Sequence, residues 1–210
     1  SSAASDVYKR QGLDLFETLG HAGCRRILCA GTCWEYGSSI GCVAEEASGT
    51  RLSLFPSFKT ALRTAGASLC DSFGMEFVWA RLFFVYGPGQ RATSLIPTCF
   101  RSLRDGQVPG IANPSALNDF VHVDDVAEAI RVLVESPDLT GVYNVGSGSP
   151  TAVWEVVNLV AECLGNPWVY RESEPAASGF WADTSRALSA GWSARIPLRD
   201  GIFRTVAALR

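Results

Sequence analysis

Several features that would assign a chain to a particular class are missing from this sequence. No segment approaches the roughly 18 consecutive apolar residues of a membrane-spanning helix, so we expect no contact with a membrane. The net charge of −3 leaves no concentrated basic face for phosphate backbones, which argues against a nucleic-acid partner. With 47% hydrophobic and 19% charged residues, the 210-residue chain is able to bury one core, or one core with a small lobe.

Paired cysteines are missing as well. The seven cysteines are scattered, several of them within apolar runs, and no CxxC motif occurs. This favours a cytoplasmic protein with reduced, buried thiols over a disulfide or zinc framework. The adjacent carboxylates Asp124 and Asp125 are typical of the start of a helix, and we predict no metal site.

Lysine is scarce, since only Lys9 and Lys59 are lysines among 18 basic residues. A guanidinium does not replace a compact, tunable ammonium, so a lysine retained in such a chain is a candidate functional residue. Residues 1–11 (SSAASDVYKRQ) have no hydrophobic period and resemble a translated sequencing adapter. We interpret them as a non-native tail, with a native disordered tail as the alternative. On the first interpretation Lys59 is the only native lysine.

Hydrophobic patterning indicates helices and strands that alternate along the chain. Helices are expected over 13–19, 56–73, 93–105, 126–134 and 151–164, with short helices after residue 166. Buried strands are expected over 26–30, 76–84 and 142–145. The connections are too long for hairpins, which predicts an α/β fold with a doubly wound parallel sheet.

Five motifs follow one another in an order typical of one family. They are AGTCWEYG (30–37), RLFFVYGPGQ (81–90), NDFVHVDDVA (118–127), GVYNVGSG (141–148) and WADTSRA followed by GW (181–192). Together they resemble the extended short-chain dehydrogenases/reductases, the NAD-dependent epimerase/dehydratase family. Within it, GTCWEYG looks most like the CDP-abequose synthase group of sugar 4-ketoreductases, and FWADTSRA is similar to UDP-galactose 4-epimerases.

The resemblance implies a Rossmann-like sheet whose first strands are missing, because no glycine-rich dinucleotide turn occurs in residues 12–210. Residues 12–165 would be the remainder of that domain with interleaved substrate-lobe segments, and 166–210 mainly a small carboxy-terminal substrate lobe. We therefore expect weak dinucleotide binding, and apolar surface exposed around Ile27, Leu28 and the helix over 13–19. The resemblance also allows a homodimer.

In this family a tyrosine moves the proton of the sugar while a hydride passes to or from the nicotinamide. A lysine one helical turn later holds the nicotinamide ribose and lowers the pKa of the tyrosine, and a Ser/Thr hydroxyl orients the substrate oxygen. The resemblance assigns these last two roles to Lys59 and Thr32; the alternatives are a solvated lysine and an ordinary strand-end residue. Phe55 stands at the tyrosine position, and a phenyl ring cannot move a proton.

The resemblance also assigns binding residues. Those for the nicotinamide end of NAD or NADP are Lys59, Phe83, Phe84 and Val85, and those for a nucleotide sugar are Thr32, Cys33, Phe84, Ile96, Asn118 and Arg171. Phe84 replaces an asparagine that contacts the substrate, and Asn118 replaces an arginine that pairs with the diphosphate, which removes a charge-assisted bond. Arg171 is either a phosphate partner or a surface arginine.

Cys33 and Trp34 stand where 4,6-dehydratases carry an Asp–Glu pair, which disfavours a dehydratase. Cys33 is either a proton donor or, more simply, a buried thiol. The resemblance thus predicts an NAD(P)-dependent nucleotide-sugar C4 epimerase or 4-ketoreductase. The alternative is a catalytically impaired or repurposed homologue that binds a sugar nucleotide. A purely structural scaffold is disfavoured by the retained Thr32 and Lys59.

Overall fold

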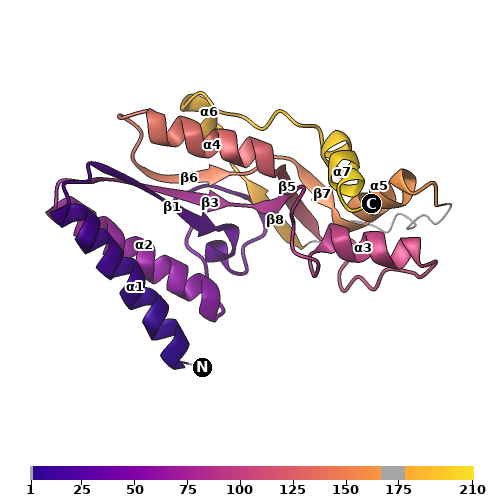
Figure 1. Ribbon diagram of the computed structural model, residues 1–210, viewed down its shortest axis with the longest axis horizontal. Helices are drawn as coiled ribbons and strands as arrows, with labels where there is room; N and C mark the ends of the chain where they lie inside the picture. The colour runs from indigo at the N-terminus through magenta and orange to yellow at the C-terminus, as the bar shows by residue number, and fades with distance from the viewer. Residues whose placement is uncertain (1, 167–177) are drawn as a thin grey trace.

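The computed structural model describes residues 2–166 and 178–210, with side chains from Gln11 onward. The molecule is elongated, with one sheet toward each end and helices above and below (Figure 1). None of the helices in the described parts of the chain is long and apolar enough to cross a bilayer.

The first sheet is parallel and has helices on both faces. Its strands lie in the order β1 (Arg26–Thr32), β3 (Glu76–Leu82) and β6 (Gly141–Val145). One face carries α1 (Ser2–His21) and α2 (Leu54–Ser72), and the other α4 (Val123–Glu135) and the short α6 (Ser185–Ser189) (Figure 1). This confirms the α/β class with a doubly wound parallel sheet. Among the described residues β1 pairs only with β3.

Continuous apolar sequence explains the central strand. Val78, Trp79 and Ala80 in β3 are completely buried, because helices cover both faces of the sheet. The helix predicted over 13–19 is longer in the structure and begins at Ser2. It packs on α2, and extending a packed helix costs less than starting a new one, so the helix continues through most of the segment that we interpreted as a tail.

A second sheet, of five short strands, was not expected from the sequence. It comprises β2 (Gly41–Val43), β8 (Gly179–Ala182), β5 (Leu117–His122) and β4 (Phe84–Tyr86), which run parallel, and β7 (Pro150–Ala152), which is antiparallel to β5. Helices α3 (Leu95–Arg104), α5 (Val153–Cys163) and α7 (Leu198–Ala207) pack around it. Strands of three to six residues are too short for a recognisable hydrophobic period, which is why the sequence did not reveal them.

The completely buried Asp119 ties the second sheet to the loop after β6. Its carboxylate accepts hydrogen bonds from the backbone N–H groups of Ser147, Gly148 and Ala182 at 2.6–3.1 Å. The glycine-serine segment at 146–148 is therefore a structural loop held by a carboxylate.

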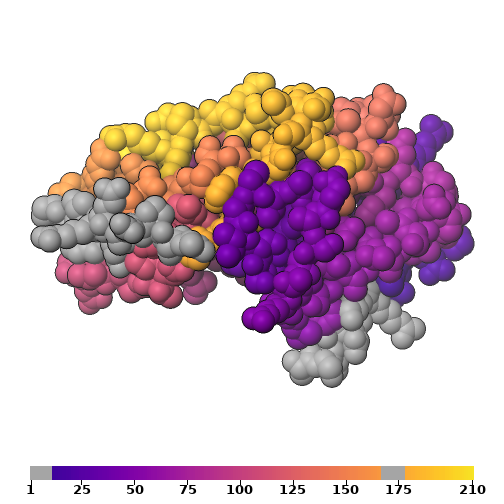
Figure 2. Space-filling view, turned by 180° about the vertical axis from the view of Figure 1, so that it is seen from behind, coloured from indigo at the N-terminus to yellow at the C-terminus, as the bar shows by residue number. Residues whose placement is uncertain are grey.

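The carboxy-terminal residues pack into the cores of both sheets. Seen from behind, they run along one edge of the whole molecule (Figure 2). Ala187 and Trp192 are buried in the core of the first sheet, whereas Ile202 and Val206 of α7 belong to the core around α3 and α5. The described part of 166–210 is thus shared between the two cores.

Candidate functional site

The carboxyl end of β1 is fixed by a reciprocal pair of hydrogen bonds. Thr32 ends the strand and caps the short 3-10 helix η1 (Cys33–Tyr36). Its hydroxyl oxygen accepts from the N–H of Trp34 at 3.4 Å, and the Glu35 carboxylate accepts from the N–H of Thr32 at 3.0 Å. This capping box holds the Thr32 side chain at the strand end, where ligands bind in open α/β sheets.

Glu35 is itself held by buried donors from β3 and α2. Its carboxylate accepts from Trp79 Nε1 at 2.9 Å and from Arg81 Nε at 3.2 Å, and Arg63 Nε lies 3.6 Å away. The Glu35 side chain has no exposed surface, so its charge is compensated by the two guanidinium groups. We did not single out Glu35 from the sequence, although the pattern Thr-x-x-Glu is a recognised sign of a capping box.

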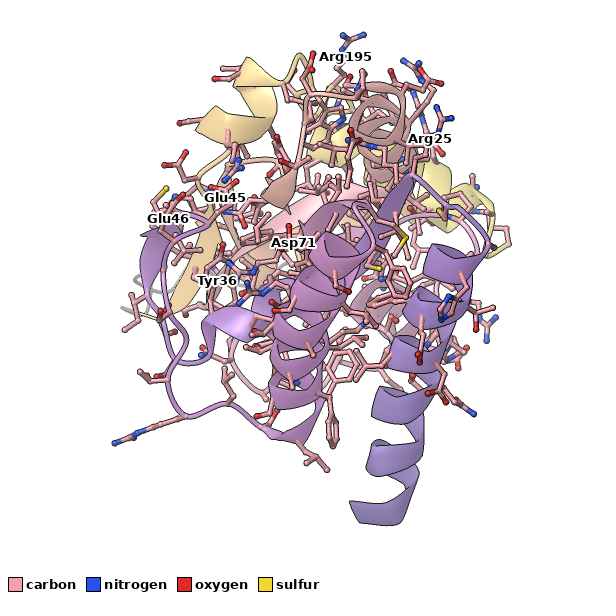
Figure 3. All side chains as sticks on the ribbon, turned by 90° about the vertical axis from the view of Figure 1, so that its left-hand side faces the viewer. Arg25, Tyr36, Glu45, Glu46, Asp71 and Arg195 are labelled. Atoms are coloured by element: carbon pink, nitrogen blue, oxygen red, sulfur yellow. The ribbon has the colours of Figure 1, made fainter. Side chains whose placement is uncertain are left out.

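Tyr36 and Glu45 extend this arrangement toward β6. The Tyr36 hydroxyl donates to Asn144 Oδ1 at 2.6 Å, and Glu45 Oε1 accepts from the N–H of Asn144 at 2.9 Å. Arg81 donates to the Glu45 carbonyl at 2.8 Å and lies over the Tyr36 ring. Figure 3 shows Tyr36 and Glu45 on the same side of α2. The end of the first sheet is therefore a polar network, and its residues Glu35, Glu45 and Arg81 also line a cavity of about 300 Å³.

Lys59 reaches the same strand end from α2. Its Nζ donates to the carbonyl oxygen of Ala30 at 2.8 Å, two residues before Thr32, and lies 5.9 Å from the ring of Trp79. Phe55, one helical turn earlier, is 58% exposed. The structure thus places Thr32 and Lys59 beside the end of β1, with Phe55 on the helix that carries Lys59.

Two cavities lie next to η1, on the side of the second sheet. The first cavity, of about 400 Å³, is lined by Phe84, Val85, Tyr86, Gln90, Ser94, Leu95, Ile96, Ile111, Asn113, Asn118, Phe120 and Val153. The second cavity, of about 450 Å³, is lined by Trp34, Gly37, Ser38, Ser39, Ile40, Asn113, Ala116, Asn118, Val153, Ser178, Gly179 and Phe180. They share Asn113, Asn118 and Val153, and both fall within the size range of small-molecule sites.

Four of the predicted binding residues, Phe84, Val85, Ile96 and Asn118, line the first cavity. Asn118 lines both cavities. Trp34, which we had not predicted as a binding residue, lines the second cavity, and its ring meets that of Phe84 edge-on at 5.4 Å between centroids.

Cys33 and Phe83 lie elsewhere. Both side chains are buried in a core cluster with Tyr36 and Phe180, and neither lines the first or the second cavity. Burial raises the pKa of the Cys33 thiol to about 12, and the charge of Asp119 adds to the effect. This burial favours the alternative that Cys33 is a buried thiol over a role in contacting the sugar or donating a proton. Arg171 lies outside the described residues.

The residues present fit the nicotinamide-ribose end of a dinucleotide. Lys59 gives one of its three N–H donors to Ala30, which leaves donors for the vicinal hydroxyls of a ribose. Lys59 is half-buried, so part of it remains accessible to a ligand.

Comparison with known proteins identifies the family. Residues 6–146 match the NAD dependent epimerase/dehydratase family. The chain is 27% identical over 205 residues to an uncharacterized UDP-glucose epimerase of Bacillus subtilis (strain 168), covering 93% of this chain and 64% of the relative. It is 27% identical over 160 residues to a probable GDP-L-fucose synthase of Oryza sativa subsp. japonica, covering 68% of this chain and 49% of that protein.

A solved structure with sequence identity similar to that of these relatives has the same fold. MoeE5, determined with NAD and either UDP-glucuronic acid or UDP-glucose, superposes with a TM-score of 0.83 at 30% identity, covering 94% of this chain and 69% of MoeE5. This chain thus spans about half to two thirds of the length of the proteins it matches. The chain belongs to the NAD dependent epimerase/dehydratase family, the nucleotide-sugar enzymes of the extended short-chain dehydrogenase/reductase type.

Proposed function

We propose that this chain carries the substrate side and the nicotinamide end of an NAD(P)-dependent nucleotide-sugar epimerase or 4-ketoreductase that transfers a hydride at the sugar C4. The observation that carries the proposal is the contact of the Lys59 ammonium with the end of β1, two residues before the capped Thr32. The arrangement combines a ribose-binding cation and an oriented hydroxyl beside cavities of suitable size.

Each side chain has a defined task in this mechanism. NAD or NADP, when bound, gives or takes the hydride. Because the Thr32 oxygen accepts from the backbone of Trp34, its hydroxyl proton is available to donate to the oxygen on the sugar C4. Lys59 binds the ribose hydroxyls with the donors that Ala30 does not use. Phe55 offers an apolar ring at the position where the proton has to be moved.

A second candidate function, binding of a sugar nucleotide without turnover, is favoured by the position of the tyrosines. Tyr36, Tyr86 and Tyr143 are the tyrosines whose side chains the structure describes, and all three are at most 4% exposed. The Tyr36 hydroxyl is moreover engaged by Asn144. None of these three is available to replace the hydroxyl that Phe55 lacks.

Substitution of Phe55→Tyr distinguishes the two candidates. In a full-length version of the protein, we expect it to raise the turnover of UDP-, CDP- or dTDP-hexoses with NAD or NADP by about 10²- to 10⁴-fold, the usual contribution of a general acid–base group. Product formation is followed by separation of the C4 epimers and by NAD(P)H absorbance. Phe203→Tyr, on the partly exposed face of α7, is the matched control and is expected to change nothing.

The outcomes separate cleanly. If the unaltered chain turns over at ordinary rates and Phe55→Tyr gains nothing, another group moves the proton and the assigned mechanism is wrong. If neither protein turns over while both bind a nucleotide sugar, the binding function is supported.

A further inference from the structure

The two cavities on the side of the second sheet have no charged side chain in their described lining. Among the described residues, every side chain that lines either cavity is apolar, a hydroxyl, an amide or a glycine hydrogen. Trp34 lines the second cavity and is 49% exposed. Its ring packs edge-on against Phe84 at 5.4 Å and against Phe180 at 5.9 Å, so other rings hold it in place.

The position of Trp34 is coupled to that of Thr32. The N–H of Trp34 donates to the Thr32 hydroxyl oxygen, and Glu35 closes the same short turn. A sugar whose C4 oxygen reaches the Thr32 hydroxyl would therefore lie beside the short turn that carries Trp34. The ring provides a flat apolar surface for the C–H groups of a hexose.

Several polar groups of the second cavity already have partners. Ser39 donates to the Tyr36 carbonyl at 2.7 Å, Ser38 and Thr50 share a hydrogen bond at 3.0 Å, and Asn113 donates to Ser178 at 3.2 Å. The guanidinium groups behind η1, those of Arg63 and Arg81, face the buried carboxylate of Glu35. A carboxylate on the sugar would thus find no unpaired cation among the described lining residues.

We propose that this site selects nucleotide sugars with an uncharged hexose and rejects hexuronic acids, and that Trp34 is the residue that sets this selectivity. The inference rests on the proposed function and adds the class of sugar to it. Its physical basis is that an ionised carboxylate loses hydration when it enters a cavity whose described lining offers no compensating charge. A hexose with a hydroxyl or a methyl group at C6 loses far less.

The test compares two ligands that differ only at C6. The nucleotide is chosen first, by calorimetric titration of the purified chain with UDP-, CDP- and dTDP-glucose and with each free nucleotide. The preferred nucleotide is then titrated as its glucose and its glucuronic acid derivative. We expect the glucose derivative to bind at least about tenfold more tightly, the effect of one uncompensated charge after partial solvation.

Variants at Trp34 assign the cause. Trp34→Lys supplies an ammonium at the same place and is expected to shift the ratio of the two affinities toward the glucuronic acid derivative by about tenfold or more. Leu188→Lys adds the same charge at a position that is 63% exposed and lines neither cavity, so it is expected to leave the ratio unchanged. Near-ultraviolet circular dichroism checks that both variants are folded.

Each result has a defined meaning. Equal affinities for the two sugars, both above that of the free nucleotide, overturn the selectivity and leave the proposed function standing. A preference for glucose that Trp34→Lys does not alter overturns the role of Trp34. If no nucleotide sugar binds more tightly than its free nucleotide, the proposed function fails and this inference fails with it.

Discussion

The end of β1 and the start of α2 supply residues to the same site, yet they are held very differently. At the end of β1, the Thr32 capping box and the buried Glu35 join backbone and side chains into one network. At the start of α2, the N-cap residue Ser53 makes no side-chain capping bond, and Leu54 and Phe55 are 60% and 58% exposed. The Thr32 hydroxyl, which we propose to orient the substrate, is thus positioned by buried residues. The place where a proton would be moved lies on an open apolar surface.

Removal of the Glu35 carboxylate tests most directly whether the buried network stabilises the end of β1. Glu35→Val leaves the Arg81 guanidinium buried and unpaired, so we expect a loss of about 3–5 kcal/mol in the free energy of unfolding. Urea denaturation followed by circular dichroism measures it.

Glu46→Val is the matched control for that measurement. The Glu46 side chain is 78% exposed and its ion pair with Arg186 spans 4.0 Å. We therefore expect a change below about 1 kcal/mol. Equal losses for the two variants would show that the buried network is not what distinguishes the end of β1.

We predict that the buried thiol of Cys33, in the same region, lowers the free energy of unfolding at alkaline pH. The folded pKa of Cys33 is raised from 9.0 to about 12 by burial. Below pH 9 the thiol is protonated in both the folded and the unfolded chain, and its contribution to stability is fully present. Between pH 9 and 12 the unfolded chain loses the proton first, so this contribution falls as pH rises. Cys33→Ala should flatten the fall in unfolding free energy over this window, and an unchanged slope would contradict it.

The smallest effect is expected at the start of α2. Because Leu54 is 60% exposed, Leu54→Ser should change the free energy of unfolding by no more than about 0.5 kcal/mol. The same substitution at Leu103, which is 3% exposed in α3, should cost about 2–5 kcal/mol, since it removes a core side chain. Thermal melts of the two variants, side by side, give the comparison. A large loss in the free energy of unfolding for Leu54→Ser would mean that the start of α2 is covered in solution.

Sequence patterns were informative where elements are long and apolar. The strands at 26–32, 76–82 and 141–145 and the helices around 54–72, 123–135 and 153–163 agree with the expected positions to within a few residues. The second sheet was missed because its strands are short and pair with distant partners; β2, for example, pairs with β8. The formation of a three-residue strand depends mainly on the neighbouring strands with which it pairs and packs, and little on its own sequence.

In the candidate site too, some residues are recognisable from the sequence, whereas the placement of others depends on the fold. Ordered motifs single out Thr32, Lys59 and Phe55, because hydrogen-bonding and proton-moving chemistry requires particular residue types at a fixed spacing on strand and helix. Cys33 looked like a site residue at the level of sequence, and the fold turns its thiol into the core.

The sequence by itself determined the parallel α/β architecture, the family and the lack of a hydroxyl at Phe55, because all three depend on local pattern and residue identity. Only the tertiary structure decided that Glu35 is held by Arg63 and Arg81 and that Trp34 stands between Phe84 and Phe180. The partners of Glu35 and Trp34 lie 28 to 146 positions farther along the chain. Contacts over such separations arise from the packing of sheets and helices, which no local spacing records.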